Sequence, residues 1–301
     1  MGFKRVGQLA VLILAVDLEL GHAASLALDL GHVGPDEGAG GRDAGGDSPE
    51  LLGVHEDLSS APTEKIHSLA DYAGFLADLK GRGFEFVVIG GCAVGSYARL
   101  FGKTVLSGDL DIYAAHSAMD EILEWGRHHE LTDIKRPQPR SIPTAFLKWR
   151  GLEVNILTGA FGLPPAEDAI RTARHFSVAG VDVPLVDPFD LLNNKLKVNR
   201  PKDRPHIEIM MQFVEEEVVA AFESETDPRE RLAPARRLLR VLKRKTLAEP
   251  LAERLVALAR TPADFRFLVN SVPLRTQAEA VLARGGDADE LRSIVKTRRF
   301  A

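Results

Sequence analysis

Two aspartates separated by one leucine have the spacing in this sequence that most directly suggests chemistry. Asp109 and Asp111 lie in the strand-like segment GDLDIY, so both side chains are expected on one face, roughly 6.5–7 Å apart along the backbone. Two carboxylates directed at one place repel each other unless a cation lies between them, and Mg²⁺ favours carboxylate oxygens together with substrate phosphates. The pair predicts a divalent metal site, and the alternative is a solvated strand end.

A glycine pair, Gly90–Gly91, ends the apolar run that precedes these aspartates. It falls where a buried strand is expected to turn into a helix, which allows the backbone to approach a ligand and directs helix N-terminal amides at it. Taken alone, the glycine pair also fits a plain tight turn. Together with the two carboxylates, it indicates a phosphate cradle beside a metal site and hence metal-assisted phosphoryl or nucleotidyl transfer.

Apolar periodicity places these residues within alternating helices and strands. The spacing predicts a helix over 63–83, a strand over 84–90, a short helix over 92–101, a strand over 109–115 and a helix over 117–130. Ser117 is the expected N-cap of the last helix, with Asp120 and Glu121 in its first turn.

Prolines between 137 and 143 mark a loop, after which two strands are expected over 144–159, joined at Arg150–Gly151. A smaller β element over 176–187 leads into a helix over 187–198, and from 201 onward the pattern is helical. The predicted fold class is therefore α/β (α+β): a small mixed sheet with helices, followed by an all-helical C-terminal extension.

Composition sets the broader frame. The 301 residues are 45% hydrophobic and 27% charged with a net charge of −5, which is typical of a soluble globular protein without overall attraction to nucleic acid or anionic membranes. The single cysteine, Cys92, excludes an intrachain disulfide framework and a CxxC metal site. Residues 1–61 are expected to be a disordered, low-complexity leader, 62–200 the α/β domain and 201–301 the helical region.

The N-terminus, MGFKR followed by the apolar run LAVLILAV, is similar to a short signal sequence. Asp17 and Glu19 interrupt this run, which is far shorter than the about 20 residues that cross a bilayer. We therefore predict a cytoplasmic protein without a membrane partner. The alternatives are export and a start codon assigned too far upstream.

The order of strand, Gly-Gly, short helix and Asp-Leu-Asp resembles the nucleotidyltransferase superfamily with the DNA polymerase β-like fold. The segment GGCAVGSYARLFG is most similar to uncharacterised bacterial and AbiEii-like toxin groups of that superfamily, with Ser107 where those groups have a threonine. A second stretch, over 183–210, is similar to the family's hydrophobic-x-acid-x-Leu-x-x-x-Lys pattern followed by Arg-x-Lys-Asp. The matching residues of the second stretch are Lys195, Arg200, Lys202 and Asp203.

The resemblance covers about residues 64–215 and implies roles for its residues. Asp109 and Asp111 would bind Mg²⁺, with two ions in an active enzyme. The residues that would contact or neutralise the phosphates are Gly90, Gly91, Ser107, Lys195 and Lys202. The implied reaction moves an NMP from an NTP, such as ATP, to a hydroxyl of a tRNA end, a protein or a small molecule. The toxin-like groups also imply a toxin role with a cognate antitoxin.

Two residues depart from the family pattern. A third carboxylate is expected in the segment LEVNIL, but its place is taken by Asn155, whose amide can offer a metal one oxygen and cannot take a proton. Glu153, two residues away on the same face, is a candidate substitute. Val105 stands where the toxin-like groups often have arginine. A second hypothesis is therefore a catalytically degenerate protein that binds a nucleotide or a partner.

The C-terminal region has an uneven charge pattern. Six acids fall within 214–227, and eight bases with one acid fall within 228–246. One interpretation is two solvated helix faces that pair with each other. The other is a basic face that binds an RNA acceptor or a phosphate-rich substrate.

Overall fold

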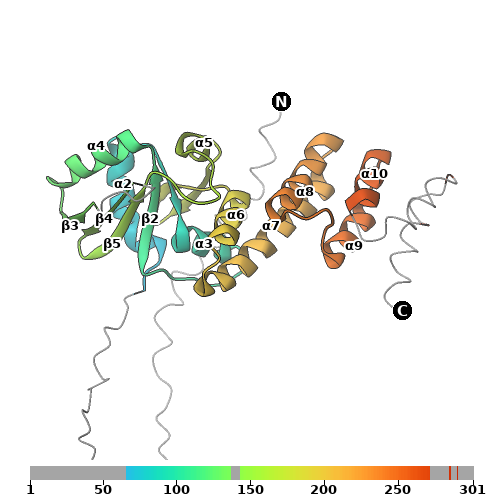
Figure 1. The fold of residues 1–301 in the computed structure, drawn as a ribbon, viewed down its shortest axis with the longest axis horizontal. Helices are drawn as coiled ribbons and strands as arrows, with labels where there is room; N and C mark the ends of the chain where they lie inside the picture. Colours follow the sequence, from blue (N-terminus) through green and yellow to red (C-terminus); the bar gives the residue numbers. More distant parts are fainter. Residues whose placement is uncertain (1–65, 137–142, 272–284, 286–289, 291–301) are drawn as a thin grey trace, which may run out of the picture. The chain divides into compact units, whose positions relative to one another are not determined.

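The computed structural model describes residues 66–136, 143–271, 285 and 290. These residues belong to the second of the two compact units into which the chain divides, Glu64–Ala301. They form a seven-stranded mixed sheet with helices, followed by further helices (Figure 1). The predicted α/β class is thus confirmed. The leader predicted over 1–61 lies outside the described residues, and the domain boundary near residue 200 stays a prediction.

The strands are β1 Phe86–Ile89, β2 Asp109–Ala114, β3 Leu131–Lys135, β4 Thr144–Trp149, β5 Leu152–Leu157, β6 Arg174–Val178 and β7 Val181–Leu185. Their order in the sheet is β3-β4-β5-β2-β1-β7-β6. β2 is parallel to β5 and antiparallel to β1, β1 is parallel to β7, and the other neighbours are antiparallel. This order places β2, which begins with the two aspartates, in the centre of the sheet.

The helical elements are η3 Leu69–Tyr72, α2 Ala73–Gly81, α3 Gly90–Arg99, α4 His116–Gly126, α5 Ala166–Arg171, α6 Pro188–Val198, η4 Pro201–Asp203, α7 Arg204–Ser224, α8 Pro228–Leu242, α9 Glu249–Leu258 and α10 Pro262–Ser271. α6 leads from the sheet and packs on α7 and α8, and α7 also packs on α3 (Figure 1). In the described part of the chain, the elements from 201 to 271 are helical, as predicted. None of the described helices is long and apolar enough to cross a membrane.

Two predicted helices differ from the structure. The helix expected over 63–83 is divided into η3 and α2, because Ser68 forms a capping box with Asp71 and starts a helical turn there. α4 begins at His116 rather than after Ser117, with extended Ala115 as its N-cap, so Asp120 and Glu121 lie beyond its first turn.

Strand β3 was not predicted. Its sequence, LTDIK, contains two charged residues, and most of its side chains are exposed. β3 is the edge strand next to β4, where one face and one edge are free of the core, so it needs little apolar periodicity.

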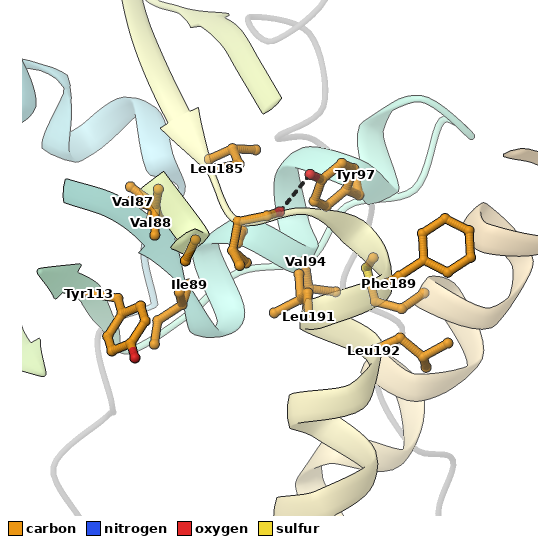
Figure 2. Packing of buried hydrophobic residues seen from close by; sticks show 14 of the residues in the cluster. Val87, Val88, Ile89, Val94, Tyr97, Tyr113, Leu185, Phe189, Leu191 and Leu192 are labelled. Carbon is orange, nitrogen blue, oxygen red and sulfur yellow. Dashed lines mark hydrogen bonds between the residues drawn. The ribbon is translucent and has the colours of Figure 1, made fainter. Parts of the chain in front are cut away.

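The apolar core holds β1 and the start of α3 in place. All four residues of β1 are buried, including Val87 and Val88, which Figure 2 shows among the packed side chains of the core. The Tyr97 hydroxyl of α3 donates a hydrogen bond to the Val186 carbonyl at 2.7 Å, drawn dashed in Figure 2. These contacts fix the turn between β1 and α3 against the strand that leads into α6.

The two faces of the sheet differ over β4 and β5. Ala145, Leu147 and Trp149 are buried on one face, where the Trp149 ring lies 5.8 Å from that of Phe75 in α2. Residues alternate in direction along a strand, so the opposite face carries the intervening side chains, among them Phe146, which is exposed. The polar positions of β2 and β5 lie on this second face.

The acidic and basic segments of the C-terminal region do not pair as one interpretation predicted. Glu216 and Glu217 of α7 form ion pairs with Arg254 of α9 and Arg174 of β6. On α8, the pairs are Arg231 with Asp264 and Arg237 with both Asp187 and Asp190. Arg231 and Arg237 therefore attach α8 to α10 and to the start of α6 rather than to carboxylates of α7.

Candidate active site

The carboxylates of Asp109 and Asp111 are brought together by one amide. β2 and β5 run parallel in a register that sets Asp111 opposite Asn155. The Asn155 Nδ2 group donates a hydrogen bond of 2.8 Å to Asp109 Oδ2 and one of 2.9 Å to Asp111 Oδ1. Because the amide carries partial positive charge on its N–H groups, it offsets part of the repulsion between the two carboxylates.

The turn between β1 and α3 lies directly against Asp111. Gly90 has a φ of +71°, and a Cβ at this position would lie 1.9 Å from Asp111 Oδ2. A Cβ on Gly91 would lie 2.5 Å from Ser107 Oγ. Only glycine, which has no Cβ, fits at positions this close to other side chains. At position 90, glycine is also favoured because the backbone is left-handed there. The glycine pair thus sets the start of α3 in contact with the carboxylate site.

Ser107 lies between the glycine turn and the first aspartate. Its hydroxyl donates to Asp109 Oδ1 at 3.2 Å. Its backbone forms an isolated bridge with His67, with N–O distances of 2.7 and 2.9 Å, which fixes the segment before β2. Ser107 is therefore in place to contact a group bound at the same carboxylates.

The second sequence stretch forms an ionic cluster around the buried carboxylate of Asp203. Lys195 of α6 is 3% exposed and donates to Asp203 Oδ1 at 3.1 Å. Arg200 donates to the same carboxylate from Nε at 2.7 Å and from Nη2 at 3.1 Å. Burial alone would raise the pKa of Asp203, but the hydrogen bonds and charges of Arg200 and Lys195 hold it well below the usual range.

This cluster lies near enough to affect the aspartate pair. Burial raises the pKa of Asp111, and the neighbouring charge of Asp109 raises it further. The Asn155 hydrogen bond and the positive charges of Lys195 and Arg200 act in the opposite direction. Lys195 and Arg200 therefore contact Asp203 and act on Asp111 through their charge. Lys202 is exposed, and its contact with phosphate stays a prediction.

Cys92 is structural. Its side chain is 3% exposed, and its thiol donates weakly to the Asp109 carbonyl at 3.4 Å. Burial, together with the charges of Asp111 and Asp109, raises the pKa of Cys92 to about 12. The thiol is therefore protonated at neutral pH and is a poor nucleophile.

Of the two candidates for the third site residue, Asn155 contacts the aspartates. Glu153 lies opposite Asp109 in the register of β2 and β5, and its side chain is exposed. The part of the chain that the structure describes contains no group of three or more His, Cys, Asp or Glu residues that could hold a metal. The oxygens at this site are instead those of two carboxylates and the Ser107 hydroxyl, and the Asn155 amide presents its Nδ2 group to both carboxylates.

Phe146 belongs to the same region and was not predicted. It lies directly opposite Asn155 in the antiparallel register of β4 and β5 and is 43% exposed. A signal for it existed in the segment TAFLKW, because Phe146 falls at the positions that alternate with the apolar residues Ala145 and Leu147.

Comparisons with known proteins give structural neighbours only. No protein-family model matches the chain, and no curated protein matches it. A solved structure of the lincosamide antibiotic adenylyltransferase LnuA, bound to lincomycin, is 13% identical, covers 46% of this chain and 94% of its own, and has a TM-score of 0.36.

An antigenic nucleotidyltransferase-like protein from Paracoccidioides brasiliensis is 13% identical over 68% of this chain and 93% of its own, with a TM-score of 0.28. A tRNA nucleotidyltransferase, complexed with a primer tRNA and an incoming ATP analog, is 15% identical over 75% of this chain and 84% of its own, with a TM-score of 0.22. These neighbours are nucleotidyltransferases or are named as similar to them. Their TM-scores all lie below 0.5.

Proposed function

We propose that this protein is a Mg²⁺-dependent nucleotidyltransferase that moves an NMP from an NTP to a hydroxyl acceptor. One observation carries the proposal: the carboxylates of Asp109 and Asp111 meet at one amide, directly against a glycine turn that has no room for a side chain. A turn without side chains lets phosphates come close to its backbone amides, and the two carboxylates beside it suit a divalent cation bound to the same phosphates.

The donor set fits Mg²⁺. Hard cations prefer oxygen ligands, and Asp109 and Asp111 supply carboxylate oxygens at one place. The nitrogen and oxygen of an amide have nearly the same shape, so a half-turn of the Asn155 amide would direct Oδ1 to the same place. The burial that raises the pKa of Asp111 also favours a bound cation, which would compensate the buried charge. When bound, Mg²⁺ polarises the α-phosphoryl group and stabilises the departing pyrophosphate.

The phosphates would lie towards β1 and α6. The backbone at Gly90 and Gly91 opens α3, and the N-terminal amides of a helix attract anions. Lys195 and Arg200, held by Asp203, add positive charge near Asp111. Strand order places Asn155 on the other side of β2, towards β5. The acceptor is therefore expected on the side of β5 and β4.

Label transfer tests the proposal. The full chain is incubated with Mg²⁺, each of the four α-³²P-labelled NTPs, and total tRNA, total protein or an aminoglycoside. We expect label on one acceptor class, together with Mg²⁺-dependent NTP binding in equilibrium dialysis. Absence of both label transfer and NTP binding would show that the proposal is wrong.

A second candidate function rests on Asn155. This amide satisfies both carboxylates without a metal, and it cannot take a proton from an acceptor. A protein that binds nucleotides but does not turn them over fits these properties, and NTP binding without label transfer would favour it.

The closeness to AbiEii-like toxins, the antitoxin partner and the cytoplasmic location stay predictions.

Replacing Asn155 by aspartate should make stability depend on Mg²⁺. Without the metal, the variant loses two hydrogen bonds to charged groups and gains a third carboxylate, so we expect it to be about 2 kcal/mol less stable than wild type. With Mg²⁺, the added ligand should raise Tm by more than it does in wild type. Thermal unfolding with EDTA and with Mg²⁺ measures both effects.

Asn270→Asp is the matched control for this change, because Asn270 is exposed on α10 and its amide donates to the Arg266 carbonyl of the same helix. Its Tm should not respond to Mg²⁺ beyond the wild-type response. An Asn155→Asp protein with the same Mg²⁺ response as Asn270→Asp would contradict the metal site.

A further inference from the structure

A row of four side chains crosses the sheet at the level of the aspartates. The strand registers set Asp111 of β2 opposite Asn155 of β5 and Asn155 opposite Phe146 of β4. Phe146 is paired with Lys135 of β3, which follows a register shift between Thr132 and Lys135. Residues directly opposite one another on paired strands project from the same face. Neighbouring strands lie about 4.8 Å apart, so the row spans about 14 Å from carboxylate to lysine. We call these four residues the sheet row.

Phe146 is the unusual member of the sheet row. β4 has a paired strand on each side, and the residues flanking Phe146 are 0% and 3% exposed, yet Phe146 itself is 43% exposed. Isolated exposed apolar side chains are common on proteins and need no function. This ring, however, lies next to the amide that binds both carboxylates, where a second substrate must approach.

Lys135 supplies a cation beside this ring. It is exposed, and it has no ion-pair partner among the residues that the structure describes. The neighbouring bases are used differently: Lys148 pairs with Asp133 at 3.0 Å, and Arg136 pairs with Asp120. One lysine thus stays available next to the exposed ring, on the side away from the aspartates.

Positive charge consequently lies on both sides of the aspartate pair. Lys195 and Arg200 lie on the side of α6 and suit the phosphates of the incoming NTP. Lys135 lies at the other end of the sheet row, beyond Phe146. Proteins bind single-stranded nucleic acids by combining an aromatic ring with a cation: a base stacks on the ring, and a phosphate lies near the cation.

We infer that the sheet row binds the single-stranded end of a nucleic-acid acceptor, with its terminal base on Phe146 and a phosphate near Lys135. This inference rests on the proposed function, whose acceptor class it names. The terminal ribose hydroxyl is presented to the α-phosphorus of the NTP. Its oxygen forms the new bond to phosphorus, the bond from that phosphorus to the β-bridging oxygen breaks, pyrophosphate leaves and the hydroxyl proton passes to water. A polycationic aminoglycoside fits the row poorly, because it has no planar ring that could stack on Phe146.

The inference is tested by measuring how tightly the full chain binds a single-stranded hexaribonucleotide. The RNA carries fluorescein, and its fluorescence anisotropy reports binding. Stacking of one base on an aromatic residue contributes about 1–3 kcal/mol, so Phe146→Ala should weaken binding about 5- to 150-fold. Phe146→Trp should bind within about threefold of wild type, since it keeps a stacking surface. Lys135→Ala should reduce the slope of log K against log salt by about 0.7, the value for one phosphate contact to a single strand.

Phe161→Ala is the matched control, because Phe161 is 66% exposed but lies in the loop after β5, outside the row. It should bind the hexaribonucleotide as wild type does. No hexaribonucleotide binding, equal losses in Phe161→Ala and Phe146→Ala, or an unchanged Phe146→Ala would each overturn the inference. Label transfer to protein or to an aminoglycoside alone would also overturn it.

The same proteins separate this inference from the proposed function. Phe146→Ala should bind Mg²⁺–ATP with wild-type affinity, because the NTP lies on the other side of Asp111. Loss of RNA binding with intact Mg²⁺–ATP binding supports the inference. Absence of Mg²⁺–NTP binding in the wild-type chain would contradict the proposed function whatever the hexaribonucleotide does.

Discussion

Replacing Asp111 by asparagine should lower the rate of nucleotidyl transfer about a thousandfold or more and leave the protein at least as stable as wild type. A metal that stabilises transition-state charge is worth several kcal/mol, and each 1.36 kcal/mol is about a factor of ten in rate. Asparagine keeps the size of the side chain and an oxygen that can accept from Asn155 Nδ2, but it removes the charge that would hold the metal.

The stability part of this expectation follows from the pKa of Asp111. Burial, and then the charge of Asp109, raise that pKa above its usual value, so the folded protein binds this proton more tightly than the unfolded chain does. Stability without metal therefore falls as pH rises from the ordinary carboxyl pKa through the raised one. The charged carboxylate destabilises the fold at neutral pH, and Asp111→Asn should remove both this cost and this part of the pH dependence.

Thermal unfolding in EDTA between pH 4 and 8, together with label transfer, measures the two parts. Asp78→Asn on the exposed side of α2 is the control and should leave transfer unchanged. An Asp111→Asn protein that is less stable at neutral pH, or that transfers label at the wild-type rate, would show that Asp111 has a structural role instead.

The central part of the fold could be predicted because its residue types and their order agree with its structure. β1 is a continuous apolar run and is buried throughout, and Gly180 allows the tight turn between β6 and β7. The apolar periodicity of the sequence did not predict the elements whose side chains are mostly exposed or buried on one side only. β3 is an edge strand with charged residues, and α4 starts at a residue without a side-chain cap. In both places tertiary packing decides the structure, and single-residue preferences do not.

Spacing placed Asp109 and Asp111 on one face, and the structure agrees, because direction along a strand follows from its two-residue period. The link between Asn155 and both carboxylates could not be predicted in this way. It depends on the register between β2 and β5, which are separated by two strands and a helix in sequence. Phe146 enters the site for the same reason, since register across β4 and β5 decides which residues become neighbours.

The register also changes how the missing third carboxylate is interpreted. An aspartate at position 155 would add a third negative charge to two carboxylates that are already close together. The asparagine instead donates to both, so the site is stable without metal and has a lower charge with which to attract one. Both proposed functions therefore depend on the same residue, and they differ in whether two carboxylates and one amide hold the cation firmly enough for transfer.

Replacing Gly90 by alanine should destabilise the protein by about 3 kcal/mol and lower transfer at least about a hundredfold. Alanine at a φ of +71° costs about 1–2 kcal/mol by itself, and its Cβ would lie 1.9 Å from Asp111 Oδ2, which must move away from Asn155. Gly102→Ala separates the two effects, because Gly102 has a φ of +66° and a Cβ added there would meet no atom within 4 Å, so only the backbone cost applies. Urea unfolding and label transfer of both variants measure the difference. Equal stability and full activity in the two variants would show that the turn does not press on the carboxylate.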